Sequence, residues 1–234
     1  MIPQAVSSAS AAIAAIRLAT ARQGIDFNYL FTQAKTESGL DPNAAAPTSS
    51  ARGLFQFTAG TWLETIRKHG REHGLGAAAA VLDAGAPIDP ATRSAILDLR
   101  RDPTASADMA AAYAADNAAK LSAGLDRPAT ATDLSLAHFL GAAGALRFLK
   151  ADPAGTASAI VPAAARANPR IFFAADGSAR SVSQVYDHFA AIFGGRPVPP
   201  TGTGLPVARQ PGVQFAAAPD AARMVYLQLA ELSA

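Results

Sequence analysis

The stretch that decides the fold, residues 26–38, has the sequence DFNYLFTQAKTES. Its apolar residues follow one another at steps of three and four, the spacing of one face of an α-helix. They are Phe27, Leu30, Phe31 and Ala34. The next position on this face is Glu37, so a carboxylate continues the side of the helix that we expect to be buried. Gly39 and Pro42 then predict the end of the helix.

A carboxylate on a buried face costs free energy unless it is paired, protonated or used in chemistry. Because burial disfavours the charged form, we expect the pKa of Glu37 to lie above its ordinary value, as a general acid near neutral pH requires. In the alternative, structural interpretation, Glu37 caps a nearby backbone group or pairs with an arginine in the core. The helix taken alone favours the structural interpretation of Glu37. The residues that follow the helix favour the catalytic one.

Composition predicts a mostly α-helical protein with one sizeable domain and room for a short appendage in its 234 residues. Half of the residues are hydrophobic, many of them alanine, and aromatic residues make up only 7%. No alternation of β-branched residues is long enough to indicate a sheet. We expect a helical domain over residues 1–195, then a Pro/Gly-rich linker and a short C-terminal helix within residues 196–234.

The formal charge of +2 suits an anionic polymer such as a cell wall, and no Lys/Arg run is dense enough to indicate nucleic-acid binding. The chain has no cysteine, which excludes disulfides and thiolate metal sites, and its four histidines show no ligand spacing. We therefore expect no metal and no cofactor. The apolar segment 6–20 is short for a membrane span and contains Arg17, so we expect a first helix of the domain. If the protein is exported, its signal sequence has been removed from this chain.

Polar residues and Asp-Pro pairs mark the expected starts of later helices. Thr61 with Glu64, and Ser181 with Gln184, have the spacing of capping boxes. Asp89 and Asp102 each precede a proline, and Thr132 is a further expected N-cap. Gly141 and Gly144 are expected to break the helix that Thr132 begins, and Gly194 to end the last helix of the domain. The region 71–87 shows no assignable pattern.

A second motif, Gly53-Leu54-Phe55-Gln56-Phe57, begins sixteen residues after Glu37. Together with the pair Glu37-Ser38, it resembles the active-site signature of the lysozyme-like (goose-type, soluble) lytic transglycosylases, which cut bacterial peptidoglycan. In that family a Gly-Leu-Met-Gln-hydrophobic segment lines the sugar cleft, and here phenylalanine replaces the methionine. The resemblance implies that the five residues line a cleft and that Gln56 binds N-acetyl groups. It also implies that Glu37 is the catalytic acid and base, and that Ser38 helps to place the muramic acid and its 6-hydroxyl. A helix-end serine can also simply bond its own backbone.

A third family motif, Ala-Tyr-Asn-Ala-Gly, is absent, and its counterpart is Ala137-His138-Phe139-Leu140-Gly141. This form resembles a variant of alphaproteobacterial and phage relatives. His138 would contact the substrate or steady Glu37, or else be a buried structural histidine, and Phe139 would adjoin the cleft. Tyr186 is expected to match a late family tyrosine that reaches the catalytic carboxylate, with core packing as its alternative role. Asn117 is a weaker candidate for the cleft.

No second catalytic carboxylate stands out beside Glu37, whereas most glycosidases need two. This agrees with the lytic transglycosylase mechanism, in which one glutamate acts first as acid and then as base, and yields a 1,6-anhydro sugar. The resemblance implies a monomeric periplasmic enzyme that acts on peptidoglycan strands. Partners in a flagellum, pilus or secretion machine would bind through the tail after Arg196. Two alternatives remain: a hydrolytic muramidase that uses the same Glu37, and a non-catalytic glycan-binding or assembly module.

Overall fold

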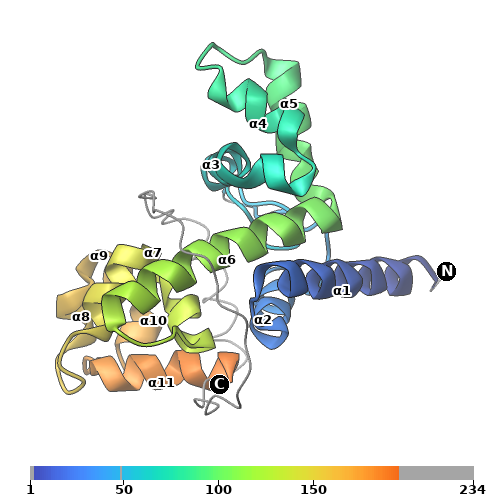
Figure 1. Ribbon diagram of the computed structural model, residues 1–234. Helices are drawn as coiled ribbons and strands as arrows, with labels where there is room; N and C mark the ends of the chain where they lie inside the picture. Colours follow the sequence, from blue (N-terminus) through green and yellow to red (C-terminus); the bar gives the residue numbers. More distant parts are fainter. Residues whose placement is uncertain (1–2, 48, 195–234) are drawn as a thin grey trace. The chain divides into compact units, whose positions relative to one another are not determined.

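The computed structural model describes residues 3–47 and 49–194, and this part of the chain is mostly helical (Figure 1). Over these residues it contains no strand, only four isolated β-bridges. The mostly α class is thereby confirmed, while the lysozyme-like fold stays a prediction. The predicted linker and C-terminal helix, residues 196–234, lie outside the described residues.

The described residues form two compact units, the first ending at Ala115 and the second beginning at Asp116. The first contains the helices α1 Pro3–Gln23, α2 Phe27–Ser38, α3 Ala59–His69, α4 Gly76–Asp83 and α5 Pro90–Asp98, with the short 3₁₀ helices η1 Gly70–His73 and η2 Leu99–Arg101. The second contains α7 Ala131–Leu149, α8 Ala157–Ile160, α9 Pro162–Ala167, α10 Pro169–Phe172 and α11 Val182–Phe193. The helix α6, Pro103–Leu125, contributes residues to both units.

Helix α2 covers the predicted stretch from Phe27 onward, with Asp26 as its N-cap, and ends before Gly39 as predicted. The Asp26 carboxylate accepts a hydrogen bond from the backbone N–H of Tyr29 at 2.8 Å, which caps the first turn. At the other end Gly39 is left-handed (φ 62°), and its N–H bonds the carbonyls of Ala34 and Lys35. The helix packs against α1, so that one of its faces is buried.

Two predicted helix starts are wrong by two or three residues. Helix α3 is capped by Thr58, whose hydroxyl accepts the backbone N–H of Thr61 at 3.3 Å, while Glu64 pairs with Arg67. Helix α7 is capped by Thr130 and not by Thr132. In both cases an earlier threonine takes the extended backbone conformation that an N-cap needs. The predicted starts at Asp89 and Ser181 are confirmed.

In the first unit, α3, α4 and α5 lie together as a small helical group between α2 and α6 in the chain (Figure 1). Trp62 of α3 is fully buried, and its indole N–H donates to the carbonyl of Ile96 on α5 at 2.7 Å. The unassigned region 71–87 contains η1 and the Ala-rich α4. In the second unit α7 packs against α11, and Gly141 (φ 70°) kinks α7 as predicted, whereas the break at Gly144 is not observed.

Candidate active site

Helix α2 places Glu37 on its buried face, where 9% of the residue is exposed. The same face carries Tyr29 and Gln33 at four-residue steps, exposed by 2% and 7%. Of the predicted apolar face, Leu30 and Ala34 are fully buried, whereas the stacked rings of Phe27 and Phe31 are half-buried. A row of buried polar side chains therefore leads along α2 to Glu37.

Tyr29, which the sequence analysis missed, is linked electrostatically to Glu37 and also to Tyr113. Burial raises the pKa of the Tyr29 hydroxyl well above its ordinary value, and Tyr113 and then Glu37 add to the rise. Tyr113 lies in the part of α6 that belongs to the first unit. The Tyr29 hydroxyl thus has Glu37 on one side of the coupling and Tyr113 on the other, each close enough to act on its charge. The four-residue steps from Tyr29 to Gln33 and from Gln33 to Glu37 could have revealed the position of Tyr29, whereas Tyr113 has no local signal.

Ser38 fastens the end of α2 to the motif loop, which we define as residues 49–57. Its hydroxyl oxygen lies 2.8 Å from the carbonyl oxygen of Leu54 and 3.0 Å from that of Ala34. The hydroxyl proton is therefore used by backbone carbonyls, and only the oxygen lone pairs are left for a ligand. This bond sets the motif loop beside the residue that follows Glu37.

Gly53 is required by the backbone of the motif loop. Its φ is +81°, and a Cβ atom added there would lie 1.9 Å from the carbonyl oxygen of Arg100. Its N–H donates to the carbonyl of Ala44 at 2.9 Å. No residue with a side chain fits this close approach without moving η2.

The side chain of Gln56 stabilises the motif loop by bonding to its backbone. Although it is not a glycine, its φ is +47°, and the residue is only 7% exposed. Its amide nitrogen donates to the carbonyls of Ala44 at 3.1 Å and Gly53 at 2.8 Å. Both amide protons are thus engaged, and the predicted contact with N-acetyl groups would fall to Oε1. The apolar residues of the motif loop, Leu54, Phe55 and Phe57, are buried as well.

The buried side chain of Arg100, in η2, binds backbone carbonyls of the motif loop. Its guanidinium donates to the carbonyls of Ser50 at 2.6 Å and Phe57 at 3.0 Å, and also to that of Leu97. Burial lowers the pKa of Arg100, and the nearby charge of Arg52 lowers it further. The Arg52 guanidinium in turn donates to the carbonyl of Ala51 at 2.7 Å. The carbonyls of this irregular segment are satisfied by side chains, which a buried loop requires.

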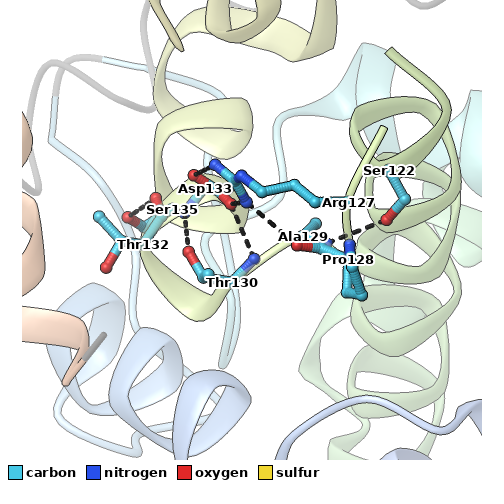
Figure 2. Close-up of polar contacts among 8 residues, drawn as sticks. All are labelled: Ser122, Arg127, Pro128, Ala129, Thr130, Thr132, Asp133 and Ser135. Atoms are coloured by element: carbon cyan, nitrogen blue, oxygen red, sulfur yellow. Dashed lines mark hydrogen bonds and ion pairs between the residues drawn. The ribbon is translucent and has the colours of Figure 1, made fainter. Parts of the chain in front are cut away.

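Two other carboxylates are buried in the part of the chain that the structure describes, and each is held by an arginine. Both oxygens of Asp108 lie 2.9 Å from Arg22. Asp133, fully buried, is bound by Arg127 at 2.5 and 3.2 Å and caps α7 through the N–H of Thr130 (Figure 2). Both buried aspartates therefore already have an arginine partner for their carboxylate oxygens, as a buried charge requires.

The remaining predicted site residues belong to the second unit, and their relation to Glu37 stays a prediction. Asn117 is buried. Phe139 is also buried, with its ring centroid 6.2 Å from that of Phe172 and 5.3 Å from that of Phe189. His138 is half-buried. Tyr186 lies near Arg127, whose pKa is raised chiefly by its hydrogen bond to Asp133 and further by Tyr186.

Over the described residues, no group of three histidine, aspartate or glutamate side chains is placed to hold a metal ion. In the same part of the chain, no helix is both long enough and apolar enough to cross a membrane. A scan of the sequence against models of known protein families finds no match.

Proposed function

We propose that the protein is a lytic transglycosylase that cleaves the β-1,4 bond between N-acetylmuramic acid and N-acetylglucosamine in periplasmic peptidoglycan. The observation that carries the proposal is the position of Glu37, a buried carboxylate at the end of α2 where Ser38 bonds the motif loop. A buried carboxyl group gains a tendency to stay protonated, as a general acid must. The identity of the substrate, peptidoglycan, is inferred from the resemblance of the motifs.

In the proposed reaction, the protonated carboxyl of Glu37 gives its proton to the glycosidic oxygen as the bond from that oxygen to C1 of the muramic acid breaks. The substrate's own N-acetyl group stabilises the positive charge that develops at C1. The Glu37 carboxylate then takes the proton of the muramic acid 6-hydroxyl, whose oxygen bonds C1 to give the 1,6-anhydro product. Glu37 ends protonated, ready for the next turnover.

One carboxylate suffices in this scheme, because the nucleophile is a hydroxyl of the substrate. A hydrolytic muramidase would instead need a positioned water and normally a second carboxylate. Asp108 and Asp133, the other buried acids of the described part, are bound by arginines.

The test is mass spectrometry of the soluble products released from purified peptidoglycan by the wild type and by Glu37→Gln. The matched control is Glu72→Gln, the same chemical change at an exposed glutamate of η1. We expect anhydro-muropeptides from the wild type and the control, and none from Glu37→Gln, with circular dichroism unchanged in all three. Loss of a general acid typically lowers the rate by a factor of about 10²–10⁴.

The other outcomes select between the alternatives. Reducing-end muropeptides, heavier by one water than the anhydro forms, would show hydrolysis and make the protein a muramidase. Anhydro products from Glu37→Gln at the wild-type rate would refute the assignment of Glu37. If no protein releases products but chitooligosaccharide still binds, the fold serves as a glycan-binding module.

A further inference from the structure

Gln33 is a buried amide one helical turn before Glu37, and the proposed function assigns it no role. It is 7% exposed, between the fully buried Leu30 and Ala34 on the inner side of α2. A primary amide has two donors and an acceptor, and its burial costs free energy unless these are bonded. An apolar residue would fill this position on a purely structural face at lower cost. We therefore expect the amide of Gln33 to form a hydrogen bond with another polar group on this face of α2.

Helix geometry brings Gln33 and Glu37 together. Residues four apart on a helix have Cβ atoms about 5–6 Å apart, and an amide at one position can bond a carboxylate at the other. Both residues are buried on one face, so solvent does not separate them. Tyr29, one turn before Gln33, lies on the same buried row, and Glu37 contributes to the raised pKa of its hydroxyl after burial and Tyr113.

The other charged groups around α2 have partners elsewhere or lie outside this row. On α1, which packs against α2, Arg17 lies over the Phe27 ring at 5.4 Å, and Arg22 binds Asp108. On α2 itself, Lys35 is exposed. The hydroxyl of Tyr29, also on α2, is coupled to Glu37, and the same hydroxyl is coupled to Tyr113 of α6.

We infer that Gln33 is a positioning residue whose side-chain amide donates a hydrogen bond to the Glu37 carboxylate. The bond fixes the rotamer of Glu37 and favours its charged form, which the second, base-catalysed half of the reaction requires. The part played in catalysis rests on the proposed function, whereas the amide–carboxylate contact does not. Without the donor, the charged form is less stable, and the pKa of Glu37 rises.

The contact is tested by following the titration of the Glu37 carboxyl carbon by ¹³C NMR in protein labelled at glutamate. The chain has four glutamates, and the Glu37 signal is the one that disappears in Glu37→Gln. Gln33→Met keeps the length of the side chain and removes the donor, and Lys35→Met on the exposed side of α2 is the control. We expect the midpoint to rise by about one pH unit in Gln33→Met, the equivalent of one hydrogen bond, and to stay in place in the control.

A folded Gln33→Met protein that titrates like the wild type would overturn the inference. If this variant does not fold, Gln33→Glu provides the second test: two adjacent buried carboxylates share one proton, so the second macroscopic step of the pair's titration moves upward. An unmoved titration in that variant would overturn it equally.

The two proposals fail in different ways. A shifted titration without peptidoglycan products leaves the contact standing and refutes the proposed function. Wild-type anhydro products with an unmoved titration leave the function standing and refute the contact. If both stand, the alkaline limb of kcat/KM must move upward in Gln33→Met, since activity falls with rising pH as the general acid loses its proton.

Discussion

Gly53 should tolerate an added methyl group far less well than Gly39, although both have positive φ. At Gly39 (φ +62°) nothing lies within 4 Å of an added Cβ, so Gly39→Ala pays only for the left-handed conformation, about 1–2 kcal/mol. At Gly53 (φ +81°) the same atom would lie 1.9 Å from the carbonyl oxygen of Arg100. Real Cβ contacts do not come closer than 3.0 Å, so the backbone of η2 must move.

The movement has a cost that follows from what Arg100 binds. Its guanidinium holds the carbonyls of Ser50 and Phe57, and a shift of its backbone weakens these bonds, worth about 0.5–1.5 kcal/mol each. Overpacking adds about 1–3 kcal/mol. With the left-handed conformation included, we expect Gly53→Ala to lower the free energy of unfolding by about 4 kcal/mol, against about 1.5 kcal/mol for Gly39→Ala.

Urea denaturation followed by tryptophan fluorescence measures this difference. Trp62 is the chain's one tryptophan, is fully buried, and lies with its ring centroid 5.2 Å from that of Phe57 in the motif loop. With a slope of about 2 kcal/mol per molar urea, the midpoint should fall by about 2 M in Gly53→Ala and by about 0.7 M in Gly39→Ala. Equal shifts in the two variants would show that the Arg100 carbonyl does not lie against Gly53, and would refute the reasoning.

Two further predictions follow from buried side chains. Arg100→Met leaves the carbonyls of Ser50 and Phe57 without their donor and should cost the first unit about 2–3 kcal/mol in the same urea assay; an unchanged midpoint would contradict it. In the second unit, burial and then the charge of Arg180 lower the pKa of His188, so the folded state resists its protonation. Stability present above about pH 6.5, the ordinary histidine value, should fall as the pH drops toward the folded pKa. His188→Gln should flatten that decline in thermal unfolding, and an equally steep decline would count against it.

The sequence predicts a helix start correctly where a polar residue directly precedes a proline or has a capping-box partner three positions on. Asp89 and Ser181 are such cases, and α5 and α11 begin where predicted. The prediction fails where threonines lie close together. Thr58 and Thr61 could each cap α3, and the choice depends on which takes the extended conformation, a property of the chain's path and not of the residue type.

Some residues of the candidate site could likewise be predicted from the sequence, and others could not. The burial of Glu37 follows from the periodicity of α2, because a helix places residues at three- and four-residue steps on one face. The burial of Tyr29 and Gln33 was missed because an analysis of apolar periodicity assigns polar residues to the solvent. Arg100 could not be found at all, since it reaches the motif loop from a different part of the chain and its contacts exist only in the folded unit.

The contacts of the motif residues show what a resemblance at these positions can and cannot establish. Ser38 bonds the carbonyl of Leu54, Gly53 makes room for Arg100, and Gln56 bonds two carbonyls of its own loop. Each of these residues is therefore explained by the backbone it stabilises, with or without a substrate. Glu37 is different, because burial of a carboxylate lowers stability. It follows that substitutions in the motif loop test the fold, and that only a substitution of Glu37 that leaves the fold intact tests the chemistry.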